Sequence, residues 1–203
     1  VAFVLGARGA GAPADAGAGD VLALNISENM NHGKTYDYFR HVVRAAPWAT
    51  HIGKMDMDAY PYLHKLAASL LEPHHCRAAY IGRPWTCYHS KKCPPAGCGK
   101  PVGRDFLRYC GEGPGGRRCG MQPCWTFMQG GLYLMSGELA RGLTAAGSAW
   151  EQRHQGYEDA VAGRAVYRYA TDNNVCVSTW DPEAWDHHMR TPTPPEGSGL
   201  PRW

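Results

Sequence analysis

The chain lacks any apolar run of about 18 residues, the length that a membrane-spanning helix needs, so no segment is predicted to cross a bilayer. It also lacks an excess of one charge: the formal net charge is +3, and the basic residues are scattered rather than grouped. Grouped basic residues are typical of nucleic-acid binding, so we expect no nucleic-acid partner. No internal repeat and no signal peptide are visible.

An initiating methionine is also missing, because the chain begins at Val1 and enters directly into the apolar run VAFVLG. We therefore expect a fragment whose upstream part is absent. The composition, 44% hydrophobic and 19% charged residues, indicates a folded protein rather than a disordered one. A length of 203 residues predicts one domain or two small ones, and the high glycine and proline content predicts long loops.

Cysteine is plentiful. Six of the eight cysteines fall between residues 87 and 124, and the even count and the clustering favour disulfides in an oxidising compartment. The alternative is a zinc site, for which only CPPAGC and CGMQPC have a suitable shape. We favour disulfides because the spacing is irregular. The cysteines are Cys76, Cys87, Cys93, Cys98, Cys110, Cys119, Cys124 and Cys176.

Strands and helices alternate along the chain. Short apolar runs predict strands at residues 1–6, 20–25, 50–56, 78–82, 130–136 and 174–180. Apolar residues at three- and four-residue spacing, with proline or glycine at the boundaries, predict helices at residues 33–47, 61–73, 137–147 and 157–169. This order predicts an α/β domain over residues 1–181, with a mainly parallel twisted sheet flanked by helices. A cysteine-rich insertion at about 83–128 and a proline-rich C-terminal segment at 182–203 lie outside the regular pattern.

Two aspartates follow the strand predicted at 50–56. In the stretch KMDMDAY, Asp56 and Asp58 are two positions apart, and on an extended chain such side chains point the same way. Two carboxylates on one side make an oxygen pocket suited to Mg²⁺ or Mn²⁺, with the remaining positions filled by water or substrate phosphates. Ligands of α/β sheets bind at the carboxyl ends of strands, where this pair lies. The alternative is that both residues cap a turn before the helix near Pro61.

Other side chains are candidates for the same site. Lys54 would pair with Asp56 or with a phosphate, or lie with its head in water. Gly130 and Gly131 would allow the backbone close to a bound sugar, and Tyr133 is the preferred aromatic for stacking on one, ahead of Trp85, Trp125 and Trp180. Glu158 and Asp159 begin a predicted helix, where acids also favour the helix dipole. His187 or His188 would complete a metal site or remain solvated, and we prefer His187 slightly.

Several of these segments resemble one family. KMDMDAY is similar to the K-x-D-D-D-x-[YF] element of the β1,3-galactosyltransferase and fringe-like group, glycosyltransferase family 31. Four further segments resemble family elements in the family's order, and together the matches cover about three quarters of the chain. They are DVLALNISENMNHGKTYDYFRHV, AAYIG, FMQGGLYLMSGELARGL and GYEDAVAG.

The resemblance implies a GT-A fold and an inverting, Mn²⁺- or Mg²⁺-dependent transfer of a galactose- or N-acetylglucosamine-type sugar. The donor would be a UDP-sugar and the acceptor a hydroxyl of a glycan, glycoprotein or glycolipid. Carried over, Asp159 is the catalytic base and Asp58 the direct metal ligand, assisted by Asp56 and His187. The donor would be bound by Lys54, Asp56, Asp58, Gly130, Gly131, Tyr133 and Glu158.

Such enzymes are Golgi-lumenal type II membrane proteins, which implies an N-terminal anchor upstream of Val1. The sequence departs from the family pattern at Met57, which replaces the middle aspartate, and at Ala160, which replaces a valine. The family's opening nucleotide-binding segment would also lie upstream, and the cysteine-rich insertion matches nothing in the family. Two alternatives remain open: a catalytically inactive sugar- or protein-binding domain on the same scaffold, and a zinc-binding interaction module built on residues 87–124.

Overall fold

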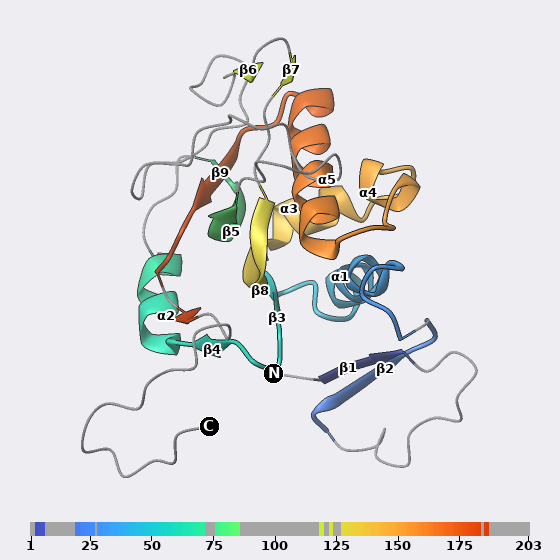
Figure 1. Cartoon of the computed structure of the whole chain (residues 1–203), viewed down its shortest axis with the longest axis vertical. Helices are drawn as coiled ribbons and strands as arrows, with labels where there is room; N and C mark the ends of the chain where they lie inside the picture. Colours follow the sequence, from blue (N-terminus) through green and yellow to red (C-terminus); the bar gives the residue numbers. More distant parts are fainter. Residues whose placement is uncertain are drawn as a thin grey trace.

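A mixed four-stranded sheet forms the centre of the protein, with strand order β3-β8-β5-β9 (Figure 1). The computed structural model describes residues 3–6, 19–26, 28–71, 76–85, 118–119, 122–123, 127–183 and 185–186. The four strands are β3 (His51–Met55), β5 (Ala78–Trp85), β8 (Phe127–Ser136) and β9 (Val177–Trp180).

Three of the four strands run in the same direction, which agrees with the predicted α/β class. The exception is β8, which lies antiparallel between β3 and β5, whereas β5 and β9 pair in parallel. The expected mainly parallel sheet is therefore right for strand direction, but two of the three neighbouring pairs are antiparallel. The apolar run of β8 is buried on both faces, and such a run predicts a strand without indicating its direction.

The two faces of the sheet are covered by different helices. Alternate residues of β8 divide between them: Tyr133 and Met135 belong to one buried cluster, and Leu132 and Leu134 belong to the other. The first cluster packs against α1, α3, α4 and α5, and the second packs against α2, on the other side of the sheet in Figure 1. The helices are α1 (Lys34–Ala45), α2 (Leu63–Leu71), α3 (Gly137–Leu143), α4 (Ala149–Gln152) and α5 (Glu158–Asn173).

Short strand pairs lie outside the central sheet. β1 (Phe3–Gly6) and β2 (Val21–Leu24), both predicted, form a separate parallel pair. Three pieces of secondary structure were not predicted: the antiparallel pairs β4–β10 and β6–β7, and the single-turn helix α4. Their strands are β4 (Tyr60–Pro61), β6 (Arg118–Cys119), β7 (Gln122–Pro123) and β10 (Trp185–Asp186).

Helix boundaries differ from the predicted ones for local reasons. Pro61 lies in β4, so α2 begins at Leu63 rather than at the proline. α5 continues past residue 169 to Asn173, because Asn174 adopts the left-handed conformation that commonly ends a helix. None of the described helices combines the length and the apolar character that a membrane crossing needs.

A disulfide joins Cys76 to Cys176, whose Cα atoms are 5.5 Å apart. Ala78 and Val177 are register partners in β5 and β9, so the bond ties together the beginnings of two adjacent parallel strands. This bond confirms that the chain uses a disulfide. The side chains of the six cysteines between 87 and 124 lie outside the described residues, so the choice between disulfides and zinc in that segment stays a prediction.

Replacing both Cys76 and Cys176 by alanine should lower the free energy of unfolding by about 2–4 kcal/mol, because the bond closes a long loop in the unfolded chain. The two cysteines are separated by 100 residues in sequence. Urea denaturation of the oxidised wild type and the double variant measures the difference, and mass spectrometry verifies that two oxidised cysteines have been lost. Equal midpoints and equal slopes would contradict the prediction.

Candidate active site

Lys54 is the centre of a cluster of charged side chains drawn from three separate segments. It lies on β3, and its ammonium Nζ donates to Asp56 Oδ1 at 2.6 Å, to Glu158 Oε1 at 2.7 Å and to the carbonyl oxygen of Gly130 at 2.6 Å. Only 10% of its side chain is exposed. Burial alone would lower the pKa of Lys54, but Glu158 and Asp56 raise it above the ordinary value of 10.5. The lysine is therefore charged and held in one position.

Glu158 is the buried partner of this lysine. It is the first residue of α5, and the hydroxyl of Tyr133 donates to its Oε2 at 2.8 Å while Lys54 occupies Oε1. Burial raises the pKa of Glu158, whereas the adjacent Lys54 lowers it. Since both carboxylate oxygens are occupied by buried donors, Glu158 fixes the position of Lys54 rather than facing a ligand.

Tyr133 is fully buried at the centre of the sheet. Its ring stacks on that of Phe39 with a centroid distance of 6.1 Å and meets the ring of Tyr80 edge-on at 5.8 Å. The role expected for Tyr133, stacking on a sugar, is wrong because neither face of the ring is accessible. Tyr133 instead donates a hydrogen bond from its hydroxyl to Glu158. Burial raises the pKa of Tyr133 well above the ordinary value, so the hydroxyl stays protonated.

Asp159 lies beside Glu158 but is only partly buried. Its Oδ1 accepts the N–H of Ala160 at 2.7 Å. Burial raises its pKa, while hydrogen bonds from the backbone N–H groups of Ala160 and Gly130, and the charge of Lys54, lower it. The carboxylate is thus held at the first turn of α5, on the side of the helix that faces Gly130.

Gly130 is the point where these side chains meet. A Cβ atom built on it would lie 2.9 Å from Glu158 Oε1, 3.5 Å from Lys54 Nζ and 3.6 Å from Asp159 Oδ2. The absence of a side chain at position 130 therefore leaves room for the ion pair. The neighbouring Gly131 accepts the N–H of Asp56 at 2.9 Å and so anchors the chain just beyond the end of β3.

Gly130→Ala should reduce any activity that depends on this cluster by at least about tenfold and destabilise the fold by about 1–3 kcal/mol, because the new methyl group displaces Glu158 or Lys54. Gly19→Ala is the matched control, since a Cβ at Gly19 would have no heavy atom within 4 Å. Thermal unfolding and activity assays on both variants test this. Two variants with indistinguishable behaviour would show that the contact is not tight.

The Asp56–Asp58 segment is a turn rather than an extended strand. β3 ends at Met55, and the N–H of Ala59 donates to the carbonyl of Asp56 at 3.1 Å. The expectation that Asp56 and Asp58 lie on an extended chain is therefore wrong. Asp56 is half-buried against Lys54, whereas Asp58 is exposed at the rim, next to Met57 with 89% of its surface accessible.

Metal-ligand candidates are sparse in the described part of the chain. There, no group of three or more histidine, cysteine, aspartate and glutamate side chains is arranged to hold a metal ion. The predicted ligand His187, like His188, lies outside the described residues. Asp56 and Asp58 are thus the two predicted ligands whose positions can be described.

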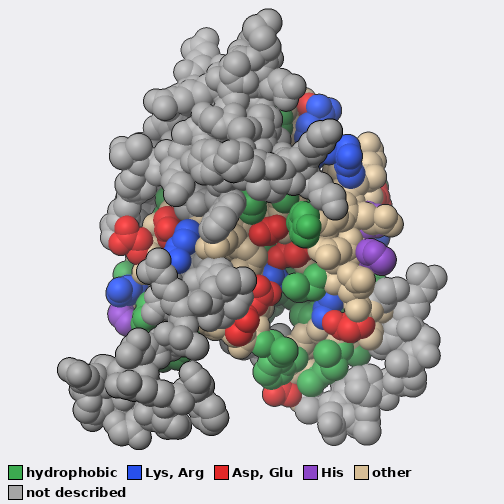
Figure 2. Space-filling view, viewed as in Figure 1, with side chains coloured by type: hydrophobic (Ala, Val, Ile, Leu, Met, Phe, Trp, Pro, Cys, Tyr) green, Lys and Arg blue, Asp and Glu red, His purple; other side chains and the backbone are tan. Residues whose placement is uncertain are grey.

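Negative charge exceeds positive charge at the cluster. Three carboxylates, those of Asp56, Glu158 and Asp159, surround the single ammonium of Lys54 within the described residues. In Figure 2, acidic side chains gather near the middle of the face shown. Carboxylates this close disfavour one another's ionisation unless a positive charge is near, and Lys54 supplies that charge.

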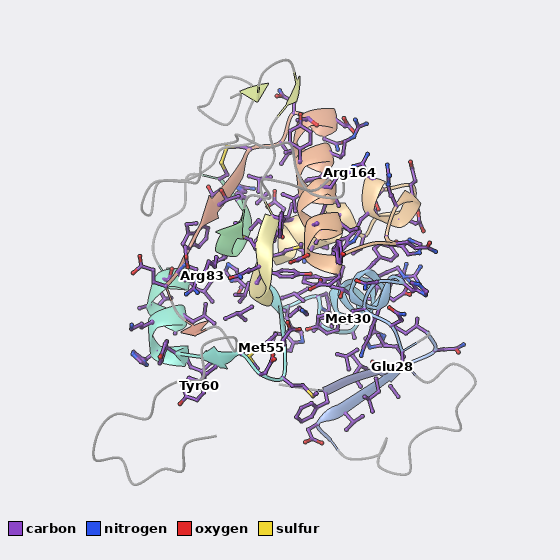
Figure 3. All side chains as sticks on the ribbon, viewed as in Figure 1. Glu28, Met30, Met55, Tyr60, Arg83 and Arg164 are labelled. Atoms are coloured by element: carbon purple, nitrogen blue, oxygen red, sulfur yellow. A yellow bond between two sulfur atoms is a disulfide. The ribbon has the colours of Figure 1, made fainter. Side chains whose placement is uncertain are left out.

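The rim beside the turn is apolar and exposed. Met55 and Tyr60, labelled in Figure 3, flank the turn, and they are 39% and 68% exposed. Together with Met57 they form an exposed apolar rim. Sequence patterns gave no reason to single out these three residues, because their exposure follows from the turn and from the short strand β4.

Two further charged residues form a pair that was not predicted. Arg83 of β5 and Asp181, which follows β9, approach within 3.8 Å (Nε to Oδ2). Burial raises the pKa of Asp181, while Arg83 lowers it. No local signal marks this contact, because it depends on the parallel pairing of two strands about 100 residues apart in sequence.

Comparison with known proteins gives no family: no family model matches the chain, and no curated protein matches its sequence.

Proposed function

We propose that the chain is a glycosyltransferase domain of GT-A type that moves a galactose- or N-acetylglucosamine-type sugar from a UDP-sugar to an acceptor hydroxyl, with inversion at the anomeric carbon. The observation that carries this proposal is the convergence of the resemblance motifs. Residues from three of these motifs form one hydrogen-bonded cluster. They are Lys54 and Asp56 of KMDMDAY, Gly130 and Tyr133 of FMQGGLYLMSGELARGL, and Glu158 of GYEDAVAG. Motifs from unrelated surface segments would have no reason to meet.

Asp159 is the base in this proposal. Its Oδ1 is held by the N–H of Ala160, and Oδ2, on the Gly130 side, takes the proton of the acceptor hydroxyl. The acceptor oxygen then forms a bond to the anomeric carbon as the bond from that carbon to the UDP oxygen breaks, and UDP leaves. A partly buried carboxylate with a raised pKa suits a base that works near neutral pH.

Lys54 and the residues around it prepare the donor side. Glu158 and Tyr133 fix the ammonium, which in turn holds Asp56 through Oδ1. Asp56 is therefore presented at the end of β3, next to the exposed Asp58. The apolar rim of Met55, Met57 and Tyr60 would receive a sugar ring.

The two aspartates fit a hard divalent cation such as Mn²⁺ or Mg²⁺ as far as their chemistry goes. Such ions take oxygen ligands and are commonly held by one or two carboxylates together with substrate phosphates, so a set of three protein ligands is not required. Asp58, with Asp56, would hold the ion. The bound ion would supply Lewis-acid stabilisation of the departing diphosphate. An oxidising compartment such as the Golgi lumen agrees with the Cys76–Cys176 bond.

Asp58→Ala should reduce Mn²⁺-dependent turnover of UDP-sugars by at least about 100-fold, because it removes a carboxylate from the diphosphate side of the site. Hydrolysis of UDP-galactose and UDP-N-acetylglucosamine by the full-length protein, with Mn²⁺ or with EDTA, is the measurement. Asp20→Asn, an exposed aspartate distant in sequence, is the control. If wild type and Asp58→Ala show the same background turnover, the chain is instead an inactive sugar- or protein-binding domain.

A zinc-binding interaction module is the other candidate, and it rests on the cysteines between 87 and 124. Metal analysis after purification without reductant separates the two. Stoichiometric zinc with free thiols in that segment would support the module, whereas fully oxidised cysteines would remove it.

A further inference from the structure

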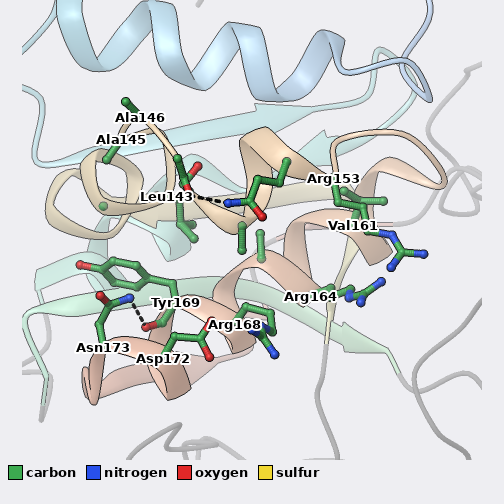
Figure 4. Close-up of a pocket in the computed structure, with 16 residues that line it drawn as sticks. Leu143, Ala145, Ala146, Arg153, Val161, Arg164, Arg168, Tyr169, Asp172 and Asn173 are labelled. Carbon is green, nitrogen blue, oxygen red and sulfur yellow. Dashed lines mark hydrogen bonds and ion pairs between the residues drawn. The ribbon is translucent and has the colours of Figure 1, made fainter.

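A cavity lies on the helical side of the sheet, away from the acidic cluster. Its volume is about 800 Å³, within the range of small-molecule sites. It is bounded by the end of α3, the loop after it, α4 and α5, as Figure 4 shows. Apolar side chains of Leu143, Val161 and Ala165 contribute to the lining, together with the polar groups of Tyr169 and Asn173.

Three arginines line this cavity: Arg153, Arg164 and Arg168. Arg168 forms an ion pair with Asp172, the lone acidic residue of the lining, with a distance of 2.9 Å between Nη2 and Oδ2. The ion pairs found within the described part of the chain include neither Arg153 nor Arg164. The lining therefore carries an excess of positive charge.

The three arginine side chains are exposed, and they line the same cavity. Burial lowers the pKa of Arg164, and the charges of Arg153 and Arg168 lower it further. An ion with two negative charges placed among them would relieve this repulsion. Guanidinium groups also match the geometry of phosphate and sulfate oxygens, to which they donate pairs of hydrogen bonds.

The cavity is separate from the candidate active site. Its α5 residues recur at the spacing of one helix face, and Asp159 projects from the opposite face of the same helix. In Figure 3, Arg164 lies well above Met55, which marks the end of β3. A ligand in the cavity would therefore not contact Lys54, Asp56 or Asp58.

We propose that the cavity between α3, α4 and α5 binds a small molecule that carries a phosphate or sulfate ester. Arg153 and Arg164 grip the oxyanion, and Arg168 joins them. The ring or chain that carries the ester packs on the apolar part of the lining at Val161 and Ala165. Nothing in this proposal depends on glycosyl transfer, so the two can fail separately.

Isothermal titration with inorganic phosphate, glucose 6-phosphate and glucose, all with EDTA present, tests the proposal. EDTA removes divalent cations, so phosphate cannot bind through a metal at Asp58. We expect saturable binding of both phosphates and none of glucose. Tighter binding of glucose 6-phosphate than of inorganic phosphate would identify an ester as the ligand, whereas equal binding would identify the free anion. No saturable binding of either would overturn the proposal.

Variants with opposite expected signs separate a binding role from misfolding. Arg153→Gln and Arg164→Gln should each weaken phosphate binding by about tenfold or more, because each removes a charged donor. Asp172→Asn should strengthen it by at least about twofold, since it removes the carboxylate that competes for Arg168. Arg44→Gln, an exposed arginine at the end of α1, should change nothing. Equal affinity in all four variants would contradict the assignment.

Discussion

Asp159→Asn should lower the rate of the proposed sugar transfer by about 10²- to 10⁴-fold, because an amide cannot take the proton of the acceptor hydroxyl. The donor side of the site should be unaffected, since Lys54 is bound to Asp56, Glu158 and the Gly130 carbonyl rather than to Asp159. The measurement is kcat for transfer, together with the Kd for UDP in the presence of Mn²⁺. A variant with unchanged kcat would assign the base to another residue.

The stability of the same variant distinguishes loss of chemistry from loss of fold. Burial raises the pKa of Asp159 above its ordinary value of 3.8, so its ionised form destabilises the folded state. The protein is therefore most stable with respect to this group when the carboxyl is protonated. That stability is fully present below pH 3.8 and is lost as the pH rises through the raised pKa of the folded state. Asp159→Asn, which carries no charge, should therefore be more stable than wild type at pH 7, and the difference should vanish below pH 3.8. Lower stability at pH 7 would show that the carboxylate supports the fold.

Lys54→Met should destabilise the protein by about 3–5 kcal/mol at pH 7, because it leaves the buried Glu158 without its charged partner. The side chain of Lys54 is 10% exposed and that of Glu158 is 8% exposed, so water cannot replace the lost contact. The pKa of Lys54 in the folded protein is raised above its ordinary value of 10.5. The contribution of Lys54 to stability is therefore fully present below pH 10.5, and it is lost only as the pH rises through the higher pKa of the folded state. Urea unfolding at pH 7 measures the effect.

A second substitution tests whether the loss comes from an unpaired charge. In Lys54→Met the pKa of Glu158 should rise further, so the variant should recover part of its stability as the pH falls and the glutamate takes up a proton. Lys54→Met combined with Glu158→Gln should recover part of it at pH 7 as well, while Tyr133 still donates to the amide oxygen. A double variant as unstable as the single one would show that packing of the lysine stem, rather than charge, carries the effect.

Much of the fold could be predicted from local patterns, and the exceptions share a cause. Each predicted strand and helix is present, because apolar periodicity and proline or glycine boundaries act over a few residues. The direction of β8 could not be predicted, since a strand buried on both faces reads the same in either direction. The turn at Met57 was only the alternative interpretation, because an alternating D-x-D pattern looks extended, while the structure ends β3 at Met55.

The candidate site shows the same division. Lys54, Asp56, Gly130, Glu158 and Asp159 could be chosen from motifs, and the structure brings them together. The pairing of Lys54 with Glu158 spans 104 residues and has no local signal. The arginine cavity was not predicted for a similar reason: its arginines come from the residue after α4 and from α5, and they line one space only after the helices pack.

Because β8 is a central strand, one half of the site tolerates substitutions poorly and the other half tolerates them well. Tyr133 and Gly130 belong to a strand that is enclosed by neighbours on both edges, so a change there disturbs the core as well as the chemistry. Met57, in the turn after β3, and Tyr60, in the short strand β4, are by contrast largely open to solvent. Directed evolution of this protein should therefore accumulate its beneficial substitutions at the turn, leaving the strand invariant while the range of accepted ligands drifts.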